Sequence, residues 1–170
     1  SVNRHTVAES AGELPAFVES DYSLLASRLN IYGVYPADLN NWERLFAEKM
    51  DDDGSGTIAW WHRNPVQKQS SVFIPVPGYD NYYPDFIVGV NDRNIGEGII
   101  LVETKNFYND DLSIAKTQVE HPVYSRPLML FRKDGRDWHT VEYDEATAKN
   151  ILDELFDIES MKAYPNSVTE

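Results

Sequence analysis

Apolar residues recur along the chain at two spacings, a helical one in some segments and an alternating one in others. The helical spacing predicts an amphipathic helix over 38–50, whose apolar positions are Leu39, Trp42, Leu45, Phe46 and Met50. Asp38 or Asn40 can cap its start, since short polar side chains accept hydrogen bonds from free backbone amides. The run at 51–56, DDDGSG, ends this helix.

Three further helices are predicted at 22–29, 110–119 and 144–156. The two ends of the chain lack a comparable apolar pattern. We therefore expect a weakly ordered lead-in over 1–20 and a frayed tail over 164–170.

Alternating apolar residues, many of them β-branched or aromatic, predict strands at 57–62, 71–76, 82–90, 98–105, 127–132 and 138–143. Short connections between consecutive strands favour antiparallel neighbours. The strands at 82–90 and 98–105 are apolar on both faces, and a sheet buried on both faces needs helices on both. The predicted fold class is therefore α/β, a mixed central β-sheet flanked by helices, with the helix at 110–119 as a crossover.

A chain of 170 residues fits one domain with extensions. We expect a helical or irregular extension over 1–36, a main domain over 37–160 and a flexible tail over 161–170. The start at Ser1, without Met, suggests a segment excised from a larger protein. No apolar run is long enough for a membrane span and no signal peptide is evident, so no membrane partner is expected.

The absence of cysteine excludes disulfides, thiolate zinc sites and cysteine nucleophiles, and fits a reducing, cytoplasmic location. Lys and Arg number 15 against 28 Asp and Glu, a net charge of −13. This balance argues against a free-standing protein that holds nucleic acid on a broad basic surface. It leaves room for a catalytic domain that a neighbouring module delivers to nucleic acid, and acidic clusters can gather divalent cations.

Charged residues stand at the ends of two apolar strands. Asp85 opens the apolar part of one strand, and Glu103 and Lys105 end the next. Strand alternation places Glu103 and Lys105 on one face and Thr104 on the other. One interpretation is an interstrand salt bridge at the rim of the sheet, because isolated buried charge is costly. The other is that the flanking apolar runs bring both carboxylates to one place, where they can hold a hard divalent cation.

Glu43 is a third candidate carboxylate, at the edge of the apolar stripe of the 38–50 helix. Glu48 points the opposite way. The helical spacing leaves two alternatives for Glu43: a ligand near Asp85, or a boundary residue whose stem packs while its carboxylate stays in water.

Pro84–Asp85 followed by Glu103-Thr104-Lys105 resembles the PD-(D/E)xK nuclease superfamily. The segments YYPDFIV at 82–88 and LVETK at 101–105 look most like the nuclease domain of restriction-enzyme subunits fused to superfamily-two helicases, as in type III restriction. ERLFA at 43–47 and WWHRN at 60–64 also occur in the order that this family shows. The resemblance covers residues 40–132.

The resemblance implies a restriction-endonuclease-like fold and an Mg²⁺-dependent DNA endonuclease, with Mn²⁺ as a substitute metal. Asp85 and Glu103 would bind Mg²⁺ together with the backbone carbonyl of Thr104, and Glu43 would hold the metal or its water. Lys105 would orient or activate the attacking water. Such chemistry needs cations where charge develops on the phosphate, which Mg²⁺ and Lys105 supply.

The resemblance also implies DNA as partner and a covalently linked helicase or translocase module. One departure affects substrate fit: the family usually has Gly after Glu-Thr-Lys, and here Asn106 follows. The alternative function is a non-catalytic protein-interaction domain on the same fold, whose acidic surface docks a partner.

Residues 51–62 imitate an EF-hand calcium loop. However, position twelve is His62, where the loop needs a bidentate Glu. Asn64-Pro65 also blocks an exiting helix. A tight turn from helix to strand is therefore favoured over a calcium-binding module.

The remaining candidates each have a simpler structural explanation. Lys116 and Gln118 could contact a phosphate, but a solvated helix face is favoured. Trp60 and Trp61 could stack on bases, but packing in the core is favoured. Structural or exposed roles are expected for the histidines, which lack ligand spacing: His5, His62, His121 and His139.

Overall fold

The computed structural model describes residues 22–92, 94, 96–164 and 166–167. The lead-in predicted over 1–20, and His5 within it, lie outside the described residues. No helix of the described part is long and apolar enough to cross a membrane.

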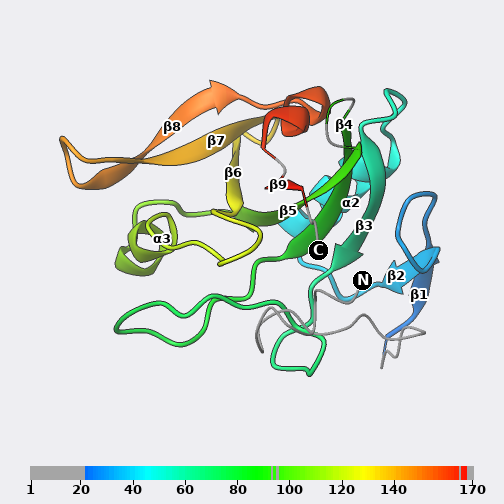
Figure 1. Cartoon of the computed structure of the whole chain (residues 1–170), viewed down its shortest axis with the longest axis horizontal. Helices are drawn as coiled ribbons and strands as arrows, with labels where there is room; N and C mark the ends of the chain where they lie inside the picture. The colour runs from blue at the N-terminus through cyan, green and yellow to red at the C-terminus, as the bar shows by residue number, and fades with distance from the viewer. Residues whose placement is uncertain (1–21, 93, 95, 165, 168–170) are drawn as a thin grey trace.

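A mixed β-sheet forms the centre of the fold (Figure 1). Its strands, in spatial order, are β3 (Ile58–Arg63), β4 (Phe86–Asp92), β5 (Gly96–Lys105), β6 (Leu128–Lys133), β7 (Asp137–Asp144) and β8 (Lys149–Leu155). A short strand, β9 (Asn166–Ser167), pairs with the first half of β5. The pairing of β5 with β6 is parallel, whereas the other neighbours are antiparallel. The predicted α/β class with a mixed central sheet is therefore confirmed.

The parallel pair depends on a crossover between β5 and β6. This connection contains α3 (Asp111–Lys116), whose N-cap Asp110 accepts a hydrogen bond from the backbone amide of Ser113. The helix lies within the predicted range 110–119 but is shorter. The connection carries the chain back along the sheet, so that β6 begins opposite Val102 and runs parallel to the second half of β5.

One face of the sheet is covered by α2 (Asn41–Asp51), which confirms the helix predicted over 38–50. Asn40, rather than Asp38, caps it. The Asn40 side chain accepts from the amide of Glu43, and the Glu43 side chain accepts from the amide of Asn40, which forms a capping box. The buried face of α2 packs into a core that includes Phe46, Met50 and Phe86.

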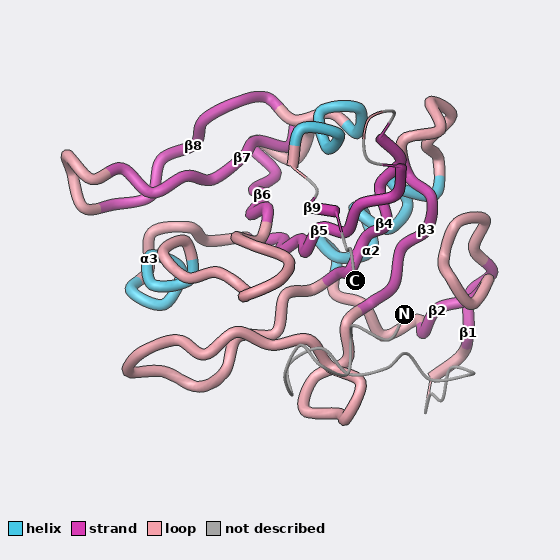
Figure 2. Tube along the Cα trace, viewed as in Figure 1, coloured by secondary structure: helices cyan, strands magenta, loops and turns pink. Residues whose placement is uncertain are grey.

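The other face is covered mainly by irregular chain, not by a second helix layer (Figure 2). The long connection between β3 and β4 provides the buried residues Val72, Ile74, Val76 and Tyr82. The strand predicted at 71–76 is absent, because the segment forms isolated bridges at Val72 and at Ile74, the latter with Tyr82. Its alternating pattern is still explained, since it buries every second residue against the sheet.

The helix prediction at 22–29 is wrong. β1 (Leu24–Ala26) and β2 (Val34–Pro36) form a hairpin there. An eight-residue helix without caps is marginal in water, and Leu24 and Leu25 are exposed rather than buried. The hairpin is fixed to the edge of the sheet by backbone hydrogen bonds between Trp61 and residues 29 and 31.

The helix prediction at 144–156 is also wrong, because the segment contains β8. A turn with Ala148 at φ 55° reverses the chain, and β8 then pairs with β7. The side chain of Asn109 exchanges two hydrogen bonds with the backbone of Asn150, at 2.8 and 2.9 Å. The Asn150 side chain is buried against Tyr108 and Thr117. These contacts with the crossover segment favour the strand over a local helix.

The end of the predicted domain also differs from expectation. A 3-10 helix, η2 (Ile158–Ala163), buries Met161 completely. The predicted boundary between 160 and 161 therefore falls inside η2, and β9, within the predicted tail, pairs with β5.

Candidate active site

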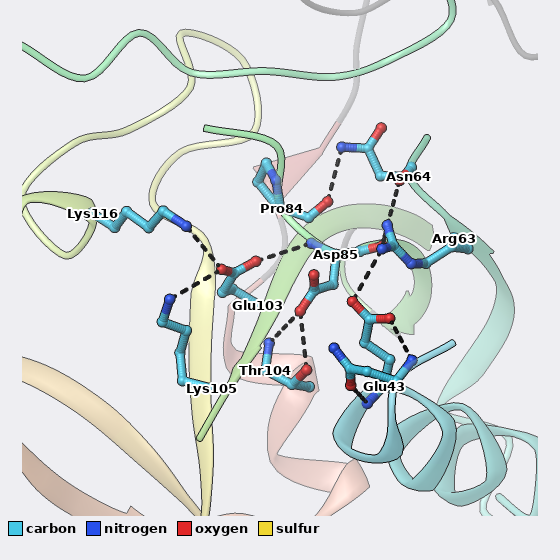
Figure 3. Close-up of polar contacts among 10 residues, drawn as sticks. Glu43, Arg63, Asn64, Pro84, Asp85, Glu103, Thr104, Lys105 and Lys116 are labelled. Atoms are coloured by element: carbon cyan, nitrogen blue, oxygen red, sulfur yellow. Dashed lines mark hydrogen bonds and ion pairs between the residues drawn. The ribbon is translucent and has the colours of Figure 1, made fainter. Parts of the chain in front are cut away.

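The candidate residues meet at one end of the sheet, beside the first turn of α2 (Figure 3). Asp85 immediately precedes β4, while Glu103, Thr104 and Lys105 are the last residues of β5. Phe86 lies opposite Val102 in the antiparallel register. This register brings the start of β4 next to the end of β5.

Asp85 ties the two strands together. Its Oδ2 accepts hydrogen bonds from the backbone amide of Thr104 at 2.8 Å and from Thr104 Oγ1 at 3.0 Å. The backbone amide of Asp85 donates to Glu103 Oε1 at 3.2 Å. The structure thus brings Asp85 and Glu103 together, as the strand pattern predicts, and Thr104 joins them through Asp85.

Glu103 is buried and pairs with two lysines. Its Oε2 lies 3.2 Å from Lys116 Nζ and 3.7 Å from Lys105 Nζ. Lys105 and Glu103 belong to the same strand, so this ion pair differs from the interstrand salt bridge that was one interpretation of the sequence. The preference for Lys116 on a solvated helix face is wrong, because the end of α3 directs this side chain into the cluster. Its ammonium also lies 4.5 Å from the centre of the Tyr82 ring.

Glu43 is 6% exposed and points to the same end of the sheet, whereas Glu48 is exposed. Glu43 Oε2 forms an ion pair with Arg63 Nη2 at 3.0 Å. Arg63 is the last residue of β3 and also donates to the backbone carbonyl of Asp85 at 3.3 Å. Sequence reasoning assigned Arg63 no role, although strand alternation from the buried Trp61 places it on the face of α2.

Burial and a neighbouring negative charge raise the pKa of two of the carboxyls, Glu43 and Asp85. Burial raises the pKa of Glu43 to about 7, the charge of Asp85 adds to this, and Arg63 opposes it. Burial likewise raises the pKa of Asp85 to about 6, with the charge of Glu103 adding to it. A positive charge placed among these carboxyls would therefore relieve their repulsion.

We expect the contribution of Glu43 and Asp85 to stability to fall as pH rises. The ordinary pKa values are 4.5 for Glu43 and 3.8 for Asp85, so the folded state holds more protons than the unfolded chain between these values and about 7 and 6. This stabilisation is complete below pH 3.8 and is lost through pH 6 to 7. Urea unfolding at pH 5 and pH 8 should show a smaller loss in Glu43→Gln than in wild type. If Glu43→Gln loses as much stability between pH 5 and pH 8 as wild type and the control Glu48→Gln do, the expectation is contradicted.

Asn64 holds the backbone next to Asp85 in place, and this role was not identified from the sequence. This fully buried side chain donates to the carbonyls of Val72 and Pro84, both at 2.8 Å, and accepts from the amide of Val72 at 2.9 Å. The backbone amide of Asn64 donates to the backbone carbonyl of Asp85 at 2.9 Å. Asn64 therefore fixes the Pro84–Asp85 turn to the end of β3.

The donor set suits a hard cation. Asp85, Glu103 and the Thr104 carbonyl offer only oxygen atoms, and Mg²⁺ is commonly held by one or two carboxylates together with waters and phosphates. Among the described residues, no group of three or more acidic or imidazole side chains is already arranged around a metal position. The donors fit Mg²⁺ by chemistry, while Glu103 is engaged by lysines in this structure.

The turn at 51–56 uses its carboxylates for other bonds. Asp51 Oδ1 accepts hydrogen bonds from Ser27 and the Trp61 indole, both at 2.8 Å. Asp53 accepts from Ser55 and from the amide of Ile58. These bonds fit a structural turn between α2 and β3. His62 is buried on β3, and burial lowers its pKa to about 4.

The described chain is thus an α/β domain with a mixed sheet and a cluster of carboxylates and lysines at one end. Comparisons with protein-family models, curated proteins and solved structures found no match to this chain. The geometry of the cluster therefore carries the functional argument.

Proposed function

We propose that this domain is an Mg²⁺-dependent DNA endonuclease of the PD-(D/E)xK type, with a restriction-endonuclease-like fold, within a larger helicase-linked protein. The observation that supports it most is the meeting of Asp85, Glu103 and Lys105 at adjacent strand ends, with Glu43 beside them. The Pro-Asp and Glu-Thr-Lys sequences that suggested this class thus lie at one place in the fold.

Hydrolysis of a phosphodiester requires a water molecule in line with the leaving oxygen and positive charge near the phosphate. Asp85, Glu103 and the Thr104 carbonyl would hold Mg²⁺, which when bound supplies that charge and acidifies its water. Lys105 shares a strand face with Glu103 and would orient the attacking water. Glu43, next to Asp85, would accept a hydrogen bond from that water or from another ligand of the metal.

The test is cleavage of labelled duplex DNA by the chain, alone and within its parent protein. We expect cleavage with Mg²⁺ or Mn²⁺ and none with EDTA. A single-stranded substrate and an RNA duplex of the same sequence define the preferred nucleic acid. Cleavage that persists in EDTA would refute the metal-dependent mechanism.

The second candidate is a non-catalytic interaction domain on the same fold. Its specific support is that Glu103 already has two lysine partners, so the cluster is stable as an internal ion-pair network. This candidate predicts no cleavage by the parent protein and no change in Mn²⁺ binding when Asp85 is replaced by Asn.

We expect the isolated domain to bind DNA weakly and with shallow salt dependence. Its net charge of −13 repels a polyanion, and the cations Arg63, Lys105 and Lys116 are engaged with carboxylates or backbone carbonyls. Titration of labelled duplex in Ca²⁺, at two salt concentrations, measures both quantities. Tight binding that survives physiological salt would reveal a local basic groove and contradict this expectation. A tethered helicase module would supply affinity by raising the local concentration of DNA.

A further inference from the structure

Two ammonium groups share a single carboxylate oxygen in the candidate site. Lys116 Nζ lies 3.2 Å from Glu103 Oε2, closer than Lys105 Nζ at 3.7 Å. The other oxygen, Oε1, accepts from the backbone amide of Asp85. Glu103 therefore has more positive charge around it than an ion pair requires, and the nearer ammonium comes from the crossover helix α3.

The position of Lys116 is built by the fold rather than by chance exposure. Its side chain is only 15% exposed. Its ammonium also faces the ring of Tyr82 at 4.5 Å, and an aromatic face attracts a cation. Tyr82 is itself buried, on the connection that also carries Pro84 and Asp85. Lys116 is thus held beside the site by two independent contacts.

We propose that Lys116 is a phosphate-binding residue that occupies Glu103 until a divalent cation replaces it. The inference rests on the proposed nuclease function and assigns this site a second cation besides Lys105. Once Glu103 holds Mg²⁺, the double charge of the metal repels the Lys116 ammonium more strongly than the single charge of Lys105 does. The Lys116 ammonium then turns toward a non-bridging oxygen of the bound phosphodiester, and the Tyr82 ring keeps it near the site.

This exchange has two consequences in opposite directions, one for the affinity for metal and one for the affinity for DNA. Removal of the Lys116 charge should strengthen metal binding, because the metal no longer competes with an ammonium for Glu103. The same change should weaken contact with DNA, because one phosphate loses its partner. A purely structural lysine would not produce this combination.

The experiment compares wild type, Lys116→Met, Lys116→Arg and the control Lys162→Met, whose lysine is exposed on η2. Mn²⁺ affinity is measured without DNA from the electron paramagnetic resonance signal of free Mn²⁺. We expect roughly tenfold tighter binding in Lys116→Met and wild-type affinity in Lys116→Arg and Lys162→Met. Circular dichroism confirms that each variant is folded.

DNA contact is measured separately, by binding of a labelled duplex in Ca²⁺ over a range of salt. Loss of one phosphate contact should reduce the slope of log affinity against log salt by about 1 in Lys116→Met. In Mn²⁺, cleavage should fall by about tenfold or more in Lys116→Met and recover in part in Lys116→Arg.

The outcomes separate this inference from the proposed function. Unchanged Mn²⁺ affinity in Lys116→Met would overturn the exchange, whether or not the protein cleaves DNA. Tighter Mn²⁺ binding with an unchanged salt slope and unchanged cleavage would overturn the phosphate contact alone. If wild type fails to cleave DNA within its parent protein, the nuclease proposal and the phosphate contact fail together, and Mn²⁺ affinity still decides the exchange at Glu103.

Discussion

Asp85→Asn is expected to lower the rate of DNA cleavage by about 10³-fold or more while leaving the fold intact. The amide oxygen of Asn can still accept from the backbone amide and hydroxyl of Thr104, which hold Asp85 at 2.8 and 3.0 Å. The change therefore removes the negative charge that would bind Mg²⁺ but keeps the local geometry. Because the pKa of Asp85 is raised to about 6 by burial and by Glu103, loss of this charge should not destabilise the domain near neutral pH.

Lys105→Met should cause a comparable loss by a different route. Glu103 keeps Lys116 as its closer partner, so its position should persist. The variant is therefore expected to retain Mn²⁺ binding and lose the catalytic step, whereas Asp85→Asn loses both. This difference separates a metal ligand from a group that orients water.

Cleavage of a labelled duplex by the parent protein, with Mg²⁺ in excess, measures both effects. Matched controls are Asp80→Asn, an exposed position on the connection before Asp85, and Lys133→Met, an exposed position on β6. Both controls should cleave at the wild-type rate. A folded Asp85→Asn variant that cleaves as well as wild type would show that the assignment of the site is wrong.

The parts of the fold that the sequence predicted are those with a long and regular apolar pattern. The spacing around Phe46 predicted α2, and the two apolar runs after Asp85 and before Glu103 predicted β4 and β5. In the same way, the helix within 110–119 predicted a crossover and hence the parallel neighbour β6. Periodicity was sufficient here because each element buries one well-defined face or both faces.

The failures at 22–29 and 144–156 have a common cause. Both segments contain apolar residues that suit a helix, but the hydrogen bonds that decide their structure come from distant parts of the chain. The loop between β1 and β2 bonds to Trp61, and β8 bonds to Asn109. Local spacing contains no information about these partners, so tertiary contacts override local preference.

The residues of the candidate site also form two groups, those that the sequence predicted and those that it did not. Glu103 and Lys105 lie on β5, and Asp85 immediately precedes β4, its predicted antiparallel neighbour. Glu43 lies on the predicted helix. Arg63, Lys116 and Asn64 join them only through the folded arrangement. The Lys116 side chain was expected to be exposed to solvent, because nothing in the helix spacing of 110–119 shows that α3 ends against Glu103.

Asn64→Ala is expected to destabilise the domain by roughly 3 kcal/mol or more. The side chain is 0% exposed, and it makes three hydrogen bonds to backbone groups of Val72 and Pro84. Alanine would leave these groups without their partner in a place that water does not reach, and each such group costs about 1–3 kcal/mol. The loop that covers the second face of the sheet would lose its main polar anchor.

Asn64→Asp offers a sharper comparison, because a carboxylate can accept from the amide of Val72 but cannot donate to the two carbonyls. We expect it to be at least as destabilising as alanine near neutral pH, since it also buries a charge. Urea unfolding with a constant slope measures both free energies, and Asn81→Ala, exposed on the same connection, is the control. An Asn64→Ala variant as stable as this control would show that the connection is not anchored through Asn64. If the connection is anchored there, loss of Asn64 should also weaken DNA cleavage, because the Pro84 carbonyl that it holds is directly bonded to the backbone of Asp85.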